Sequence, residues 1–253
     1  MRTRDRSSGG MERIRIGCSG WSYRDWRGPF YPEKLPAKDW FAFYATTFDT
    51  VEINNSFYRL PGDAHFAKWR DQAPPGFCYA VKASRFITHD KKLKDPQAPL
   101  DRFLGNARLL ADHLGPILYQ LPPHWRFDRA RLAHFLACLP EDLVHVLEFR
   151  EPSWMTEEVL ALLDRHGVAF CTHDMPGMKV PRCASGRAAY VRFHGHKSKY
   201  RGRYPEAVLR DWADWMVGQA KDGRGVWAYF NNDYDADAVQ DALTLRAMIG
   251  QAR

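Results

Sequence analysis

The chain has 253 residues, of which 45% are hydrophobic and 26% charged, a composition typical of a soluble globular protein with one sizeable core. It carries no uninterrupted apolar run of about 18 residues, which argues against a membrane span. Its net charge of +7 favours anionic partners, either phosphorylated small molecules or nucleic acid.

The chain opens on a basic, polar segment, MRTRDRSSGG, with no apolar stretch behind the positive residues. This is not the pattern of a secretory signal. We expect residues 1–12 to form a disordered basic tail, with Met11 as an alternative start, and residues 13–253 to form a single domain. The five cysteines are scattered and form no C-x-x-C pair, which favours a reducing cytoplasm over a disulfide framework or a cysteine zinc site.

Eight short apolar segments recur along the chain and predict β-strands. They are IRIGCSG (14–20), TVEINNS (50–56), FCYAVKA (77–83), ILYQLP (117–122), HVLEFR (145–150), AFCTHD (169–174), YVRFHG (190–195) and VWAYFNND (226–233).

Segments with helical spacing lie between these strands. The segment 99–115 is predicted to be one helix that ends at Gly115, because its apolar residues repeat on one face. The segment 156–167 begins with an N-cap candidate, Thr156, and ends at Gly167. Further helices are predicted over 205–223 and 235–250.

This alternation of strand and helix predicts a parallel α/β fold. Eight units in about 240 residues match a single (β/α)8 TIM-barrel-like domain, in which some units can be irregular. A doubly wound open sheet is the alternative, but it would want a glycine-rich phosphate turn after the first strand, and GCSGWSY fits that turn poorly.

Polar residues share one face of several predicted strands. In HVLEFR, Glu148 and Arg150 alternate with Leu147 and Phe149. The same alternation puts a polar group on one face of other strands: Glu52, Asn54, Lys82, Arg192, His194 and Asn231. Since the apolar set must pack on the helices, we expect the polar set to line the barrel at the carboxyl ends of the strands, where barrel enzymes assemble their sites. An inert network of ion pairs is the alternative.

Eight ordered motifs carry a family resemblance. GCSGWSY, WRGPFYP, FDTVEINNSFYRLP, VKASRFITH, LYQLPP, LEFREPSW, YVRFHG and YFNND together resemble the YecE-like family, catalogued as domain of unknown function 72. The resemblance runs from about Ile14 to about Leu245. It implies a TIM-barrel-like fold and carries no established reaction.

The charged cluster predicts an enzyme of hydrolase, lyase or isomerase type that acts on an anionic, phosphorylated or sugar-like small molecule. The predicted catalytic residues are Glu52, Glu148 and His194. The predicted ligand-binding residues are Trp21, Tyr23, Asn54, Lys82, Gln120, Arg150, Asp174, Arg192, Tyr200, Tyr204, Asn231, Asn232 and Asp233. Arg150 and Arg192 are expected to clamp a carboxylate or phosphate of the ligand.

No cofactor is predicted. A divalent metal is the less favoured alternative; its ligands would come from Glu52, Glu148, Asp174, His194 and Asp233. The two arginines at the same mouth would repel a cation, so no metal ligand is assigned. In CTHD, strand alternation allows only one of His173 and Asp174 to face inward.

The alternative function is nucleic-acid binding, or a nuclease-like barrel, through the basic loops 82–94 and 194–204. The second loop interleaves its positive residues with Tyr200 and Tyr204, and such an arrangement suits stacking on bases. The sequence leaves the oligomeric state open.

Overall fold

The structure, a computed structural model, describes residues 14–251. Its eight strands are β1 (Ile14–Cys18), β2 (Thr50–Ile53), β3 (Cys78–Lys82), β4 (Leu114–Gln120), β5 (His145–Glu148), β6 (Ala169–Asp174), β7 (Ala188–Phe193) and β8 (Gly225–Phe230). Its helices are α1 (Trp40–Thr47), α2 (Asn55–Tyr58), α3 (Asp63–Gln72), α4 (Gln97–Arg108), α5 (Arg129–Ala137), α6 (Glu157–Arg165), α7 (Glu206–Lys221) and α8 (Asp237–Gln251).

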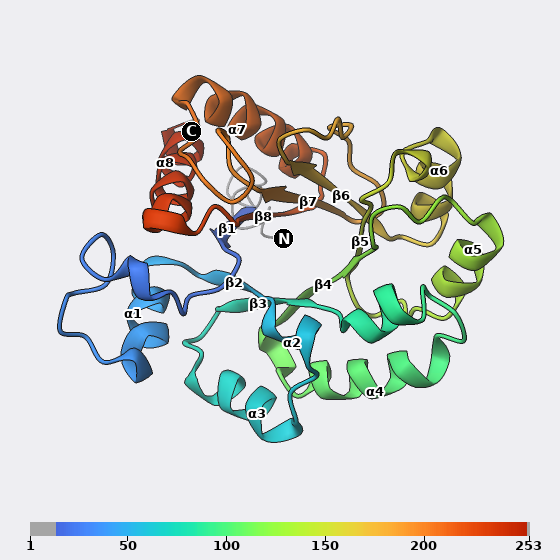
Figure 1. The fold of residues 1–253 in the computed structure, drawn as a ribbon, viewed down its shortest axis with the longest axis horizontal. Helices are drawn as coiled ribbons and strands as arrows, with labels where there is room; N and C mark the ends of the chain where they lie inside the picture. Colours follow the sequence, from blue (N-terminus) through green and yellow to red (C-terminus); the bar gives the residue numbers. More distant parts are fainter. Residues whose placement is uncertain (1–13, 252–253) are drawn as a thin grey trace, which may run out of the picture.

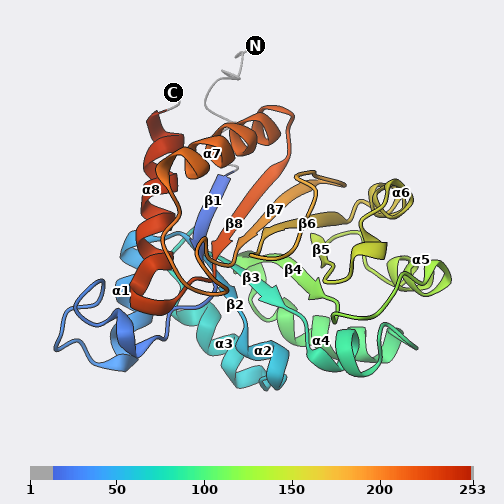
Figure 2. The same cartoon turned by 45° about the horizontal axis from the view of Figure 1, so that its top comes forward.

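The strands form one parallel sheet in the order β1-β8-β7-β6-β5-β4-β3-β2, which curls into a nearly closed barrel with the helices outside it (Figure 1). The predicted (β/α)8 fold is therefore confirmed. It is irregular between β6 and β7, where residues 175–187 form a loop instead of a helix. Figure 2 shows α7 and α8 together beside β1 and β8.

The two ends of the sheet, β1 and β2, meet through side chains. The Tyr44 hydroxyl on α1 accepts a hydrogen bond from the Cys18 amide and donates one to the Thr50 carbonyl, both at 2.9 Å. Gly17 makes this approach possible, because a Cβ there would lie 2.3 Å from the Thr50 oxygen. This phenol thus links the two edges of the sheet that close the barrel, together with the pair of Arg15 on β1 with Asp49 just before β2.

The barrel encloses its own small apolar core. Its members occupy alternate strand positions: Ala80, Leu118, Val146, Ala169, Cys171, Ala188, Tyr190 and Tyr229. The other face of each strand packs on the helices in the main core. Continued toward the carboxyl ends, the inward positions become Glu52, Lys82, Glu148 and Arg192, all buried. This confirms the predicted alternation and places the charges above an apolar plug.

The predicted helix over 99–115 is wrong at its end. Helix α4 stops at Arg108, a short 3-10 turn follows at Ala111–His113, and β4 already begins at Leu114. Gly115 belongs to β4, and it must be a glycine because a Cβ there would lie 2.3 Å from the Cys78 sulfur on β3. The glycine thus permits close packing of two strands instead of ending a helix.

The other helix predictions agree closely with the structure. Thr156 caps α6 by accepting a hydrogen bond from the Val159 amide at 3.4 Å, and Gly167 adopts φ 64° after the helix ends. The expected disordered tail, residues 1–12, lies outside the described residues. Within residues 14–251, no helix combines the length and apolar character that a membrane crossing requires.

Candidate functional site

A cavity of about 350 Å³ opens at the carboxyl ends of the strands. It is lined by Tyr23, Asn54, Tyr58, Lys82, Gln120, Arg150, Arg192, His194, Tyr200, Asn231, Asp233 and Tyr234. Four of these are tyrosines, and two of them stand well into solvent, with Tyr58 76% and Tyr234 49% exposed. The site therefore combines a polar interior with an aromatic rim.

Four charged side chains form a network at the base of this cavity. Arg192 on β7 donates from Nη2 to Glu52 on β2 and from Nη1 to Glu148 on β5, both at 2.8 Å. Arg150, just after β5, donates from Nε to the other oxygen of Glu148. Two positive and two negative charges thus cancel where little water can reach, as buried charges require.

Glu52 is held by neighbours from several strands. Besides Arg192, its carboxylate accepts hydrogen bonds from Ser19 Oγ at 2.9 Å, Asn54 Nδ2 at 3.0 Å and the Tyr190 hydroxyl at 2.8 Å. A carboxylate with four donors has its orientation fixed. This explains the polar residues in the second strand: Glu52 and Asn54 belong to one hydrogen-bonded cluster.

Glu148 is also fixed, and it is ionised. Burial opposes its charge, but Arg150 and Arg192 outweigh burial and hold the pKa of this carboxyl well below its usual value. Arg150 and Arg192 were expected to bind a carboxylate or phosphate of the ligand, but in the structure they bind groups of the protein itself. Most guanidinium donors of Arg150 and Arg192 already bind Glu148, Glu52 and His194.

His194 follows β7 and is fully buried. Its Nε2 lies 3.0 Å from Nη2 of Arg150, and its Nδ1 lies 3.1 Å from the side-chain amide of Asn231. Burial and the two arginines lower the pKa of His194 well below its usual value, so the ring is neutral. Because a guanidinium only donates, Nε2 must accept and the ring proton sits on Nδ1. The Asn231 amide must then turn its oxygen toward Nδ1, in place of the amide nitrogen that lies 3.1 Å away.

Lys82 ends β3 and reaches into the cavity, with only 8% of the residue exposed. Its Nζ donates to Oε1 of Gln120 at 2.7 Å and lies 4.2 Å from the centre of the Phe57 ring. Burial, reinforced by the charge of Arg192, lowers the pKa of Lys82 from 10.5 to about 7. At neutral pH a substantial fraction of this amine is therefore uncharged.

Asp233 follows β8 and lines the same cavity. The indole of Trp26, in the loop after β1, donates to the backbone carbonyl of Asp233 at 2.8 Å and fixes the segment. Burial raises the pKa of the Asp233 carboxyl from 3.8 to about 8, and the charges of Asp25 and Glu52 add to this. Among the described residues, none forms a hydrogen bond with its buried Oδ1.

Four predicted ligand-binding residues lie outside this cavity. Tyr204 is buried against Phe193 and Phe230, and Asn232 is buried with its Nδ2 donating to Asp241 at 2.9 Å. Trp21 lines a neighbouring, smaller cavity of about 170 Å³. Asp174 does not line the main cavity, because the inward position on β6 belongs to His173.

The predicted site residues leave out His173, Tyr58 and Tyr234. His173 shares its face of β6 with Ala169 and Cys171, whereas Phe170 and Asp174 share the other face; the bulky Phe170 was the signal that could have assigned the two faces. Tyr58 ends α2 and Tyr234 begins a short 3-10 turn, both beyond the strand ends, where strand alternation gives no guidance.

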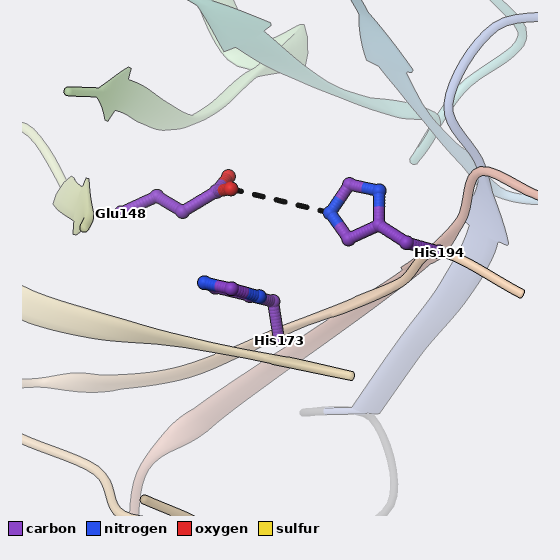
Figure 3. Close-up of side chains that lie close together, drawn as sticks. All are labelled: Glu148, His173 and His194. Carbon is purple, nitrogen blue, oxygen red and sulfur yellow. Dashed lines mark ion pairs between the residues drawn. The ribbon is translucent and has the colours of Figure 1, made fainter. Parts of the chain in front are cut away.

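One group of side chains could hold a metal. The carboxylate of Glu148 and the rings of His173 and His194 converge from the ends of β5, β6 and β7 (Figure 3). One ligand atom from each lies within 4.8 Å of the others. This set differs from the one expected from the sequence, since it replaces Asp174 with His173 and leaves out Glu52 and Asp233.

Comparison with known proteins shows a family match and a related bacterial protein. Residues 15–253 match the family described as "Protein of unknown function DUF72". The UPF0759 protein YunF of Bacillus subtilis (strain 168) is 26% identical over 269 residues, which cover 93% of this chain and 94% of that protein.

Solved structures give the same result. A DUF72 family protein from Thermotoga maritima MSB8 superposes with a TM-score of 0.84 at 28% identity, over 94% of this chain and 99% of its own. A DUF72 family protein from Enterococcus faecalis V583 shares the fold, with a TM-score of 0.78 at 18% identity, over 94% of this chain and 95% of its own.

Proposed function

This chain belongs to the DUF72 family, and we propose that it is an enzyme that moves protons on a small, hydroxyl-rich molecule held in the barrel mouth, with Lys82 and Asp233 as its acid–base pair. One observation carries the proposal. Two groups that line the same cavity have pKa values displaced toward neutrality from opposite directions, to about 7 for Lys82 and about 8 for Asp233.

General acid–base catalysis works best when the pKa of the acting group lies near the working pH. Between pH 7 and 8, Lys82 can accept a proton as a neutral amine, while Asp233 can donate one as a neutral acid. Such displaced values cluster at functional sites, because the burial that causes them is costly to maintain elsewhere. Hydrolysis, elimination and isomerisation can all use such a pair.

Lys82 and Asp233 were predicted to bind the ligand, and the three residues predicted to be catalytic take a supporting role in this proposal. Glu148 is ionised and holds Arg150 and Arg192, which suits a group that positions its neighbours. Glu52 accepts four hydrogen bonds and is fully buried. The neutral His194 ring accepts from Arg150. These groups form a preorganised polar floor under the ligand.

The lining indicates the class of ligand. The amides of Asn54, Gln120 and Asn231 offer donors and acceptors to hydroxyl groups, and the tyrosine rim offers flat faces to a sugar ring. Because the buried charges cancel, an anionic substituent would meet the loop 194–204 instead. There the Arg201 guanidinium lies 4.0 Å from the centre of the Tyr234 ring. We therefore propose a sugar or sugar-like molecule, with a phosphate or carboxylate at the rim.

The test begins with a panel of sugars, sugar acids and sugar phosphates screened by thermal shift. Binders are then incubated in deuterated water and followed by NMR, since exchange of a carbon-bound proton reports abstraction even without net conversion, and product signals report hydrolysis or elimination. Lys82→Met and Asp233→Asn should each lower the rate by about 10²–10⁴-fold. Lys221→Met, at the end of α7, is the matched control. Wild-type rates in both site variants would refute the proposal.

The alternative, nucleic-acid binding, draws support from the loop 194–204, where Lys197, Lys199 and Arg201 are exposed. The loop 82–94 supports it less, because Arg85 pairs with Asp90 at 3.6 Å. Anisotropy of a labelled single-stranded oligonucleotide at 50 and 200 mM salt tests it, because phosphate contacts weaken steeply over that range. Lack of binding at 50 mM salt would remove this alternative.

A further inference from the structure

We propose that Glu148, His173 and His194 form a binding site for a divalent transition metal, and that the guanidinium of Arg150 occupies that site as an exchangeable internal cation. This inference goes beyond the proposed proton transfer. It is tested by metal binding and does not depend on Lys82 or Asp233.

The ligand set has the composition of known metal centres. Two imidazoles and one carboxylate, with further positions open, suit zinc, cobalt, iron or manganese. All three residues are buried, and each comes from the end of a different neighbouring strand. Figure 3 shows the rings of His173 and His194 and the carboxylate of Glu148 gathered around one region. Side chains on rigid strands hold such a centre better than loops do.

His173 supplies an observation that an inert ion-pair network does not explain. Its Nε2 donates to the backbone carbonyl of Phe149 at 3.0 Å, which leaves Nδ1 with its lone pair free. His173 is only 3% exposed, and among the described residues no group forms a hydrogen bond with that Nδ1. A buried acceptor without a partner is costly. A metal-binding histidine has this arrangement, with one nitrogen fixed by a carbonyl and the other open to the ion.

His194 is fixed in the matching way. With the ring proton on Nδ1, on the side of Asn231, Nε2 carries the lone pair; it accepts from Arg150 and lies 4.0 Å from Glu148 Oε1. Metal bonds to these ligand types are about 2.0–2.2 Å long, so at tetrahedral angles two ligand atoms of one ion lie about 3.4 Å apart. From separations of up to 4.8 Å, the triad must contract by up to about 1.4 Å to close around an ion.

Arg150 uses the lone pairs that an ion would need. Its Nε donates to Oε1 of Glu148 and its Nη2 to Nε2 of His194. Guanidinium and metal are therefore mutually exclusive. Arg150 also lines the cavity, so its side chain can move toward solvent when an ion arrives. Replacing the guanidinium by a divalent ion adds one positive charge to the cluster at most, and the carboxylates of Glu52 and Glu148 remain to balance it.

A metal held there would polarise a carbonyl or hydroxyl oxygen of a ligand in the same cavity. The residues that would hold it are the three named, with Phe149 and Asn231 orienting the two rings from behind.

The experiment measures binding of Co²⁺ by equilibrium dialysis and by its visible absorption spectrum, with Zn²⁺ titrated calorimetrically in parallel. The wild-type protein should bind one ion per chain. Arg150→Gln removes the competing cation and should bind at least tenfold more tightly. His173→Ala should bind at least tenfold more weakly. His166→Ala, an exposed histidine at the opposite end of the barrel, controls for adventitious surface binding.

Equal affinity of the wild type and Arg150→Gln would overturn the role of Arg150. Unchanged binding in His173→Ala, or no stoichiometric binding by any variant, would overturn the site. Circular dichroism verifies that each variant is folded. If Arg150→Gln does not fold, the comparison of wild type with His173→Ala and His166→Ala still decides whether the site exists.

Discussion

Replacing Asp233 with asparagine should make the protein more stable, and the gain should grow as the pH rises. The two side chains have nearly the same shape, but asparagine cannot ionise. Asp233 ionises with a pKa of about 8 in the folded protein, against 3.8 as its ordinary value. Folding therefore favours its neutral form, and the folded state is penalised wherever the unfolded chain has lost this proton.

The magnitude follows from the linkage between proton binding and stability. Between pH 3.8 and about 8 the folded state binds more protons at this site than the unfolded state, so the free energy of unfolding falls as the pH rises. Each pH unit in this window corresponds to about 1.4 kcal/mol. The penalty is then about 2 kcal/mol at pH 5 and about 6 kcal/mol at pH 9, a difference of about 4 kcal/mol.

Urea unfolding of the wild type and Asp233→Asn, followed by tryptophan fluorescence at pH 5 and pH 9, measures this difference. The stability gain of the variant should be several kcal/mol larger at pH 9. Asp214→Asn, on the exposed side of α7, removes the same charge from the surface and serves as control. A gain that does not change with pH, or a variant less stable than wild type at pH 9, would refute the reasoning. The same variant should lose turnover, so stability and activity would move in opposite directions.

Three more predictions concern the barrel interior. NMR titration of the lysine side chains should show Lys82 changing charge near pH 7, and a midpoint above pH 9 would contradict its proposed role. Arg192→Met leaves buried carboxylates without their partner and should lower the free energy of unfolding, measured in urea, by about 3–5 kcal/mol. Arg108→Ala, which breaks an exposed ion pair, should lower it by less than about 1 kcal/mol, and similar losses in the two variants would argue against the buried network. Gly17→Ala places a methyl group 2.3 Å from a backbone oxygen and should lower the thermal midpoint by about 5 °C or more, so an unchanged midpoint would show that β1 and β2 lie farther apart.

The fold could be predicted because its signals are local. Short apolar segments identified every strand, and the cap at Thr156 and the glycine at 167 marked helix ends. The end of α4 was missed because the glycine at position 115 is required by a tertiary contact: Cys78 on the neighbouring strand lies too close to leave room for a side chain. Nothing in the sequence around Gly115 distinguishes a strand glycine from a helix stop.

The site could be predicted in its membership but not in its pairing. Alternation brought Glu52, Glu148 and Arg192 to one interior. That a single guanidinium would serve both carboxylates depends on the relative register of β2, β5 and β7, which strand alternation does not fix. The displaced pKa of Asp233 was equally inaccessible, because it depends on burial under the loop that follows β1. Strand alternation predicts which way a side chain points, whereas its protonation state depends on how the side chain is packed.

The phenol that links β1 to β2 has a consequence for how this wall can open. All other neighbouring strands of the barrel are paired by backbone hydrogen bonds, whereas between β1 and β2 the Tyr44 hydroxyl accepts from Cys18 and donates to Thr50. Loss of one oxygen atom, as in Tyr44→Phe, would leave all seven backbone ladders intact and still remove the link between Cys18 and Thr50, so that β1 and β2 would be held by side-chain pairs such as Ser19 with Glu52 and Arg15 with Asp49. The amide of Cys18 would then exchange its hydrogen with solvent faster than its neighbours on the β8 side, which makes it a reporter for breathing of the barrel.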